Sequence, residues 1–421
     1  MKNIKFFFKQ LANKLWFRPI IFCLVSVIAA LLAQLADNSF LVDIAPAIEQ
    51  ESVEELLNTI SATMLVIAIF AVGAMLSAFA SASSTATPRS FKLIVSDDVS
   101  QNALSVFIGS FIYSIVATIA LQNGLYGKAG YFTLFVLTLA VFALVIITFL
   151  RWVERISKLG RLGHTIKKVE DAAMKAFKAR KKAPTMGGLP GVFRTEKGHA
   201  IYSDKYGYVQ HINLGMLQKW AEENDMQLSI HCLPGAFAAA DKPLFYITNG
   251  FSSHKEQALK SARKLFVIGN ERSFDDDPRF GVIALSEIAS RALSPGINDP
   301  GTAIAIMSSH VRLFTVLAQQ GDSGKDTEVV YNRVEVPEVD LIDLFDDAFR
   351  PIARDGANNI EVMIRLQKAL QTIAHLGDAA ASRLAVTHSF AAFERSKIAM
   401  EYDGDIALLE KECLFTRNQS V

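Results

Sequence analysis

The residues best suited to chemistry lie in two short stretches of the C-terminal half, residues 270–281 and 291–302. Their candidate ligand or interface residues are Arg272, Asp277, Arg291, Ser294, Asn298, Asp299 and Thr302. An arginine side chain suits an anionic group because its donors form a planar fork, and three adjacent acids at 275–277 could bind a divalent cation. Each stretch also contains Asp-Pro, the pattern of an N-cap followed by proline at the first helical position. Each stretch is therefore either a binding site, a subunit contact or a turn that starts a helix.

The usual catalytic and cofactor motifs are absent from the sequence. It contains no Gly-x-x-x-x-Gly-Lys loop, no His-Glu-x-x-His, no Gly-x-Ser-x-Gly elbow and no dinucleotide fingerprint. The three cysteines are scattered, and the eight histidines never pair at ligand spacing on an expected helix. We therefore expect no enzyme activity, no cofactor, no metal ion, and free thiols.

The elements that carry these stretches belong to the second part of a chain that divides sharply by charge. The 421 residues include 43 Lys and Arg and 42 Asp and Glu, yet residues 1–150 hold only 16 of these charged side chains. This division excludes a disordered chain and a wholly soluble protein. It indicates a membrane part followed by a soluble part.

Four uncharged runs precede residue 151. They are Pro19–Ala36, Leu56–Pro88, Val99–Gly127 and Ala129–Leu150. Because about 20 apolar residues in a helix cross a bilayer core, we predict a transmembrane domain over residues 1–150. Its four transmembrane helices are expected at about 19–36, 58–81, 100–121 and 130–150. None of the four runs contains a charged residue, which argues against a proton relay or an ion-coupled pump.

The basic residues predict the orientation. The first 18 residues carry five bases, the loop over residues 37–55 carries six acids and no base, and residues 151–182 carry eleven bases against three acids. Short basic flanks stay in the cytoplasm, so both termini are expected to be cytoplasmic.

The second and third spans carry small and hydroxyl residues at four-residue spacing, which places each set on one helix face. These candidates for pore lining or helix packing are Gly73, Ser77, Ser81, Thr85, Ser110, Ser114 and Thr118. Hydroxyl faces could line a water-filled path, whereas small faces also let helices pack closely. The sequence leaves both interpretations open.

Beyond the fourth span we expect a soluble α+β region in three parts. Residues 151–182 read as a basic amphipathic helix that continues the fourth span and touches lipid headgroups. Residues 183–250 read as a small β-rich module and residues 251–421 as a helical domain. Residues beyond 182 sum to a charge of −7, so a nucleic-acid partner is not expected.

Arg291-Ala-Leu-Ser-Pro-Gly-Ile-Asn-Asp-Pro300, preceded by Arg272 and by Asp277-Pro-x-Phe-Gly281, resembles the signature of predicted bacterial inner-membrane proteins grouped as domain of unknown function 2254. Residues 81–89, 207–210 and 234–244 are also similar to that family. The resemblance implies a multi-pass protein of the bacterial inner membrane. This chain has Ala236 and Asp241 where the family usually has Asp and Gly.

The 234–244 segment also resembles the turn of barrel-sandwich modules such as lipoyl-like domains. Alanines at 238–240 stand where a carrier lysine would be, so the module is interpreted as structural.

Two functions are consistent with these patterns. The first is an oligomeric channel or transport-like protein, in which the second and third spans of several copies surround an axis and the cytoplasmic part senses or gates. The second is a membrane-anchored ligand sensor or scaffold, with Arg272, Arg291, Asn298 and Asp299 around one pocket. An enzyme is disfavoured because no nucleophile and base are paired in the sequence. The expected partners are the lipid bilayer, further copies of this chain, and a small ligand or ion.

Overall fold

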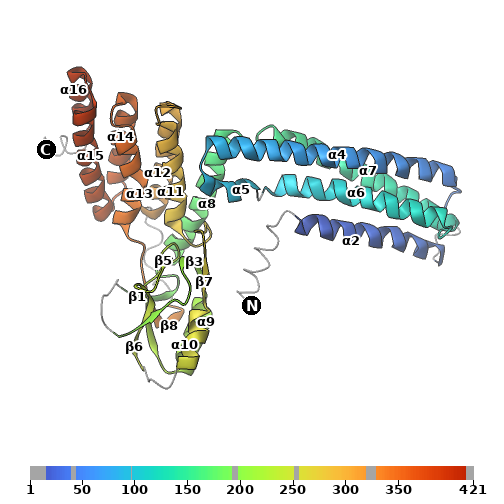
Figure 1. The fold of residues 1–421 in the computed structure, drawn as a ribbon, viewed down its shortest axis with the longest axis horizontal. Coiled ribbons are helices and arrows are strands. Elements are labelled where there is room, and N and C mark those ends of the chain that lie inside the picture. The colour runs from blue at the N-terminus through green and yellow to red at the C-terminus, as the bar shows by residue number, and fades with distance from the viewer. Residues whose placement is uncertain are drawn as a thin grey trace. The chain divides into compact units, whose positions relative to one another are not determined.

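A computed structural model describes residues 16–38, 44–95, 97–191, 198–250, 256–318 and 329–413 (Figure 1). The chain forms two compact units, residues 1–165 and residues 166–421. Each unit has its own hydrophobic core.

The first unit is a set of long helices lying side by side (Figure 1). In chain order they are α2 (Phe17–Leu32), η1 (a 3₁₀ helix, Ala33–Asn38), α4 (Gln50–Thr85), α6 (Asp98–Gln122) and α7 (Lys128–Ile156). A short 3₁₀ turn, η2 (Pro88–Ser90), and a one-turn helix, α5 (Phe91–Val95), connect α4 to α6. Helix α6 is the central helix, because α2, α4 and α7 all pack against it.

Small residues on α6 make this close packing possible. A Cβ atom added at Gly109 would lie 3.2 Å from both Phe22 Cβ and Ser26 Oγ of α2. Aromatic side chains fill the remaining space, with Phe107 and Trp152 both buried between α6 and α7. The unit is therefore held by direct helix-to-helix contact.

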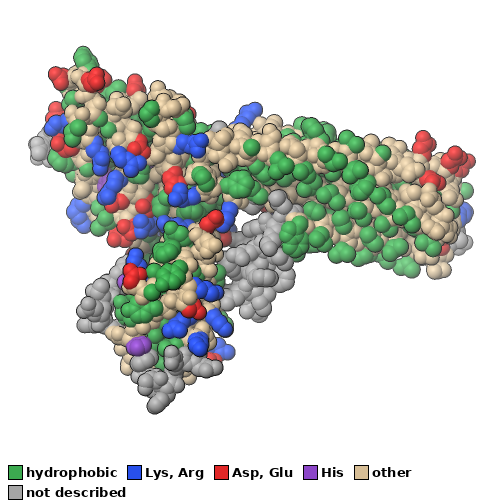
Figure 2. Space-filling model, viewed as in Figure 1, with side chains coloured by type: hydrophobic (Ala, Val, Ile, Leu, Met, Phe, Trp, Pro, Cys, Tyr) green, Lys and Arg blue, Asp and Glu red, His purple; other side chains and the backbone are tan. Residues whose placement is uncertain are grey.

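The face of the first unit seen in Figure 2 carries many exposed apolar side chains and few charged ones along its middle. Ile69, Phe70 and Leu76 of α4 are all more than 60% exposed, and α2 and α7 carry similar exposed side chains. Soluble proteins rarely expose an apolar surface of this extent, whereas a lipid-facing helix requires one. In the described chain, five helices are long and apolar enough to cross a membrane: α2 with η1, α4, α6, α7 and α12 (Pro300–Ala318).

Polar contacts hold both ends of the first unit. At one end Asp97 caps α6 by accepting from the Ser100 amide, and Arg155 of α7 donates to both Asp97 carboxylate oxygens. At the other end the Asp37 carboxylate accepts from the amides of Gly127 and Gly130 at the start of α7. Charged groups therefore lie at the ends of the helices and leave the middle apolar.

The basic connecting helix differs from the prediction. It was expected to run unbroken over residues 151–182, but α7 ends at Ile156 and α8 spans Leu162–Lys182. Gly160 separates them with a φ of +88°, a left-handed conformation that ends a helix. Apolar spacing continues through Leu159 and Leu162, which is why the pattern alone suggested one helix.

The second unit begins with two sheets. The strands are β1 (Gly188–Gly191), β2 (His199–Tyr202), β3 (Gly207–Ile212), β4 (Gln227–Ile230), β5 (Phe237–Ala238), β6 (Pro243–Asn249), β7 (Phe266–Gly269) and β8 (Tyr331–Pro337). One sheet has the order β1-β8-β4-β6-β2 and the other β5-β3-β7. Helices α9 (Leu214–Glu223) and α10 (Glu256–Arg263) accompany them, and the stacked rings of Phe245 and Phe266 lie in the shared core.

Two strands come from the segment predicted to be helical, so the β-rich module does not end at residue 250. Strand β7 pairs with β3, and β8 pairs in parallel with both β1 and β4. The segment 331–337 has period two, with Val334 and Val336 buried. The barrel-sandwich form is not confirmed.

The remaining helices form a bundle. They are α11 (Pro278–Ala292), α12, α13 (Leu341–Asp355), α14 (Ile360–Ala374), α15 (Ala379–Ala399) and α16 (Asp403–Glu412). Helix α11 packs against α12 and α13, α13 against α15, and α14 against α12, α15 and α16. Gly281 of α11 lets α8 approach, since a Cβ there would lie 2.4 Å from Ala173 Cβ. The prediction of a mostly helical region after residue 251 therefore holds for this bundle.

Candidate functional site

The start of α11 brings together two segments that lie about forty residues apart in the sequence. Asp277 caps the helix by accepting from the amides of Arg279 and Phe280, and Arg272 donates to both oxygens of the same carboxylate at 2.7 and 3.0 Å. Gly235, with a φ of +95°, lies directly against this pair. A Cβ at Gly235 would be 2.3 Å from Asp277 Oδ2, so only glycine fits there.

A cavity of about 310 Å³ opens beside this ion pair. Three segments line it, residues 231–236, residues 272–279 and residues 339–343. Asp277 is only 2% exposed, and burial raises the pKa of its carboxyl while Arg272 opposes the shift. Two nitrogens of Arg272, Nε and Nη2, bind Asp277. A buried ion pair at the wall of a pocket is an arrangement that recurs at functional sites.

Further charged contacts link this site to its neighbours. Arg279 donates to Asp347 at 2.7 Å and also pairs with Asp343, which ties the start of α11 to α13. Arg180 of α8 is 8% exposed and donates to the Asp276 carbonyl, and burial lowers the pKa of its guanidinium. The pocket wall is therefore fixed by ion pairs and hydrogen bonds to two helices, α8 and α13.

The second predicted stretch lies at the other end of α11. Asp299 accepts from the amide of Thr302 at 3.0 Å and from its hydroxyl at 2.6 Å, and Asn298 has a φ of +49°. The Ser294 hydroxyl donates to the Arg291 carbonyl. Fifteen helical residues span about 22 Å, so the structure does not bring Arg291, Asn298 and Asp299 to the pocket of Arg272. The prediction that Arg272 shares one pocket with these three residues is therefore wrong.

The pore candidates also divide into two groups. Gly73, Ser77 and Ser81 are exposed on α4, whereas the Thr85 side chain lies outside the described part. On α6, Ser110 and Ser114 are buried, and the Ser114 hydroxyl donates to the Ser110 carbonyl. Thr118 is half-buried. The α6 set therefore packs inside the unit, and only the α4 set faces outward.

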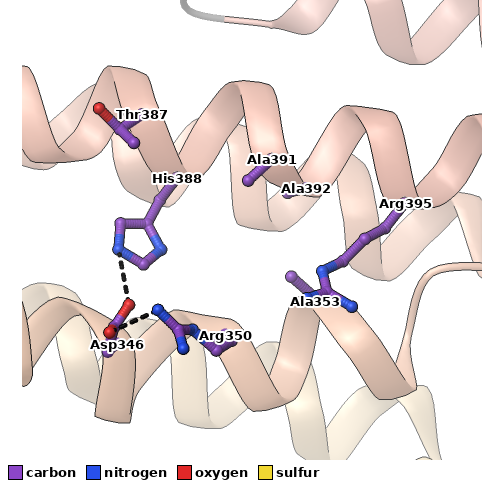
Figure 3. A pocket seen from close by; sticks show the side chains of 8 residues that line it. All are labelled: Asp346, Arg350, Ala353, Thr387, His388, Ala391, Ala392 and Arg395. Carbon is purple, nitrogen blue, oxygen red and sulfur yellow. Dashed lines mark ion pairs between the residues drawn. The ribbon is translucent and has the colours of Figure 1, made fainter.

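Sequence reasoning did not find a notch of about 220 Å³ between α13 and α15 (Figure 3). Its lining residues are Asp346, Arg350, Ala353, Thr387, His388, Ala391, Ala392 and Arg395. Asp346 pairs with Arg350 at 2.5 Å and lies 3.4 Å from His388 Nε2. The four-residue spacing of Asp346 and Arg350 indicates a polar helix face, but nothing local indicates that α15 lies opposite.

In the described ranges, no three His, Cys, Asp or Glu side chains form a group that could hold a metal ion. Cys23, Cys232 and Cys413 are free thiols, and burial raises the pKa of Cys232 to about 11. Such a thiol is protonated and unreactive at neutral pH.

Apolar helices with lipid-type surfaces, followed by an α+β unit, define a membrane protein. Residues 12–372 match the family described as predicted membrane protein, domain of unknown function 2254, and the chain belongs to that family. Uncharacterised proteins of Mycobacterium bovis and of two strains of Mycobacterium tuberculosis are 45% identical to it over 53 residues. That match covers 13% of this chain and 10% of each relative. No solved structure matches the chain.

Proposed function

We propose that this protein is a membrane-anchored sensor whose second unit binds a small polar molecule in the pocket at the start of α11. The observation that carries the proposal is the buried Arg272–Asp277 pair at the wall of a cavity of about 310 Å³. Burying an ion pair contributes little net stability, so stability alone is a weak reason for placing one there. Gly235 lets the backbone of residues 234–236 pack directly against the pair, which a larger residue would prevent.

The lining of the pocket favours a ligand with charges of both signs. Arg272 has one terminal nitrogen, Nη1, beyond the two that bind Asp277, and it suits a carboxylate or another anionic group. Asp340 and Asp343 line the pocket at the start of α13; Asp343 pairs with Arg279, and Asp340 suits an ammonium or another donor. Leu233, Pro234 and Val339 provide an apolar wall between them. A small zwitterion of amino-acid type fits this distribution.

The placement in the membrane is part of the proposal. Helices α2, α4, α6 and α7 are the four spans, and α12 belongs to the soluble core. Helix α12 carries Arg312, which pairs with the buried Glu170 of α8 at 2.6 Å, and such a pair is costly in lipid. Both termini would be cytoplasmic in the bacterial inner membrane. A C-terminal fluorescent fusion that matures only in the cytoplasm should be bright, whereas a C-terminal alkaline phosphatase fusion should be inactive; the reverse pattern contradicts this topology.

Binding is tested by thermal shift of the full-length protein in uncharged detergent, using single amino acids and small dicarboxylates as probes. A bound probe should raise the melting temperature in a saturable way. Arg272→Lys retains the charge but loses the fork, so it should abolish the shift. Arg291→Ala is the matched control, because Arg291 is an exposed arginine at the other end of the same helix. If no probe shifts the protein, or Arg272→Lys responds like the wild type, the proposal is wrong.

A second function is favoured by one observation on the first unit. Gly73 and Ser77 form a small, weakly polar, exposed face on α4, and no atom lies within 4 Å of a Cβ at Gly73. Ser81 continues this face, and its hydroxyl donates to the Gly160 carbonyl. Several copies meeting along this face would form an oligomer with a hydroxyl-lined axis, which is a channel.

The channel is tested by cross-linking and by conductance. Ser77→Cys should form a disulfide-linked dimer in membranes, whereas Leu65→Cys, on the exposed apolar surface of the same helix, should not. Conductance in planar bilayers that falls in Ser77→Leu would support a channel. Absence of both cross-linking and conductance would leave the sensor as the function.

A further inference from the structure

We propose that the notch between α13 and α15 is a separate binding site that holds one phosphate group between Arg350 and Arg395. It is independent of the pocket at the start of α11. Arg350 comes from α13 and Arg395 from α15, and both guanidinium groups lie between the two helices (Figure 3).

Both arginines have guanidinium N–H groups that can donate to a ligand. Arg395 is exposed, and within the described residues it makes no hydrogen bond or ion pair. Arg350 pairs with Asp346 through Nη2 at 2.5 Å, and its other guanidinium N–H groups can donate to a ligand. Two guanidinium groups facing one space provide more donors than the carboxylate of Asp346 can accept.

The charge in the notch favours an anion. Two arginines face one aspartate, and His388 adds no charge at neutral pH because burial lowers the pKa of its imidazole, with Asp346 opposing the shift and Arg350 reinforcing it. Thr387 and three alanines, Ala353, Ala391 and Ala392, form the rest of the wall, which is largely apolar. An apolar wall lowers the local dielectric and strengthens the attraction of the arginines for an oxyanion.

Size and geometry favour phosphate over a larger or flatter anion. A volume of about 220 Å³ is below the usual range for drug-sized ligands, so the occupant is small. A carboxylate offers two coplanar oxygens that match a single arginine fork, whereas a phosphate offers three or more oxygens and can bridge two forks. The phosphate group is either inorganic phosphate or the terminal group of a small organic phosphate.

Asp346 competes with the ligand for Arg350. The carboxylate occupies one side of the guanidinium and also repels an incoming anion. Neutralising Asp346 should therefore strengthen phosphate binding, an outcome that a purely structural role of the ion pair does not predict.

The site is tested by calorimetric titration of the full-length protein in uncharged detergent at constant ionic strength. The probes are inorganic phosphate, glycerol phosphate and acetate. Phosphate should bind saturably, and Arg395→Ala should weaken it about ten-fold, the loss expected for a charge-assisted contact. Arg383→Ala is the matched control, since Arg383 is exposed on the same helix and lies outside the notch.

Asp346→Asn is the variant expected to increase the affinity for phosphate. It should tighten phosphate binding about two- to five-fold, as expected for releasing a partly exposed ion pair. Tighter binding of glycerol phosphate than of inorganic phosphate identifies an organic phosphate as the source, and the reverse identifies the free ion. The proposal is overturned if Arg395→Ala binds phosphate as the wild type does, if acetate binds more tightly than phosphate, or if Asp346→Asn weakens binding.

Discussion

The same local sequence, Asp-Pro, lies near both ends of α11 but in two different environments. Asp277-Pro278 begins α11, and Asp299-Pro300 begins α12, with each aspartate accepting from backbone amides of the first turn. Asp277 is 2% exposed and holds Arg272 beside a cavity, whereas Asp299 is half-buried and its carboxylate, in the contacts described, accepts from Thr302 alone. A helix-capping motif therefore becomes a candidate site only where distant segments cover it.

The largest expected difference is between the two aspartates. Asp277→Ala should lower the free energy of unfolding by about 3–5 kcal/mol, because the mostly buried Arg272 loses its partner and α11 loses its cap. Asp299→Ala removes only a cap and should cost about 1 kcal/mol. Denaturant unfolding of the full-length protein in detergent measures both; equal losses would contradict the contrast.

Replacing a glycine should also cost more stability beside Asp277 than in the turn before Asp299. Gly235→Ala places a Cβ against Asp277 at a positive φ and should cost about 1–3 kcal/mol. Gly296→Ala, in the exposed turn after α11, meets no atom within 4 Å and should change stability by less than about 0.5 kcal/mol. Melting temperatures of the two variants test this, and a larger loss for Gly296→Ala would show that the turn is the more constrained of the two.

The smallest expected effect is on the pH dependence of stability, and it concerns His388 of α15. His388 has a lowered pKa in the folded protein because of burial, so its contribution to stability is complete above the ordinary histidine pKa. That contribution is lost as the pH falls below about 6.5 toward the folded pKa. His388→Gln should therefore reduce the fall in melting temperature between pH 7 and pH 5, and an unchanged slope would contradict this assignment.

The sequence predicted those features that depend on near neighbours. Asp277 and Asp299 were expected to cap helices and do so, because capping needs only the next three residues. The helix break at Gly160 was missed, since apolar spacing continues across it and the glycine alone did not outweigh the pattern. Strand β8 was missed although Val334 and Val336 alternate with polar residues, because helical segments surround it.

The candidate sites were predicted only in part. Arg272 and Asp277 were singled out, but their meeting with Gly235 depends on how β3, β5 and α11 come together, and no local spacing encodes that. The notch of Arg350 and Arg395 depends on the packing of α13 against α15. Long-range register therefore decides which polar side chains share a cavity.

The position of β8 has a consequence for synthesis on the ribosome. It lies between β1 and β4 in the five-stranded sheet, and Gly188 pairs with Tyr331, which is made 143 residues later. At about 5–20 residues per second, the edges of β1 and β4 wait on the order of ten seconds for their shared neighbour. The first unit, which ends at residue 165, waits for no later strand and can insert during this interval. Membrane insertion should therefore finish before the sheet closes, and a ribosome stalled before residue 331 would leave an anchored chain with two open strand edges.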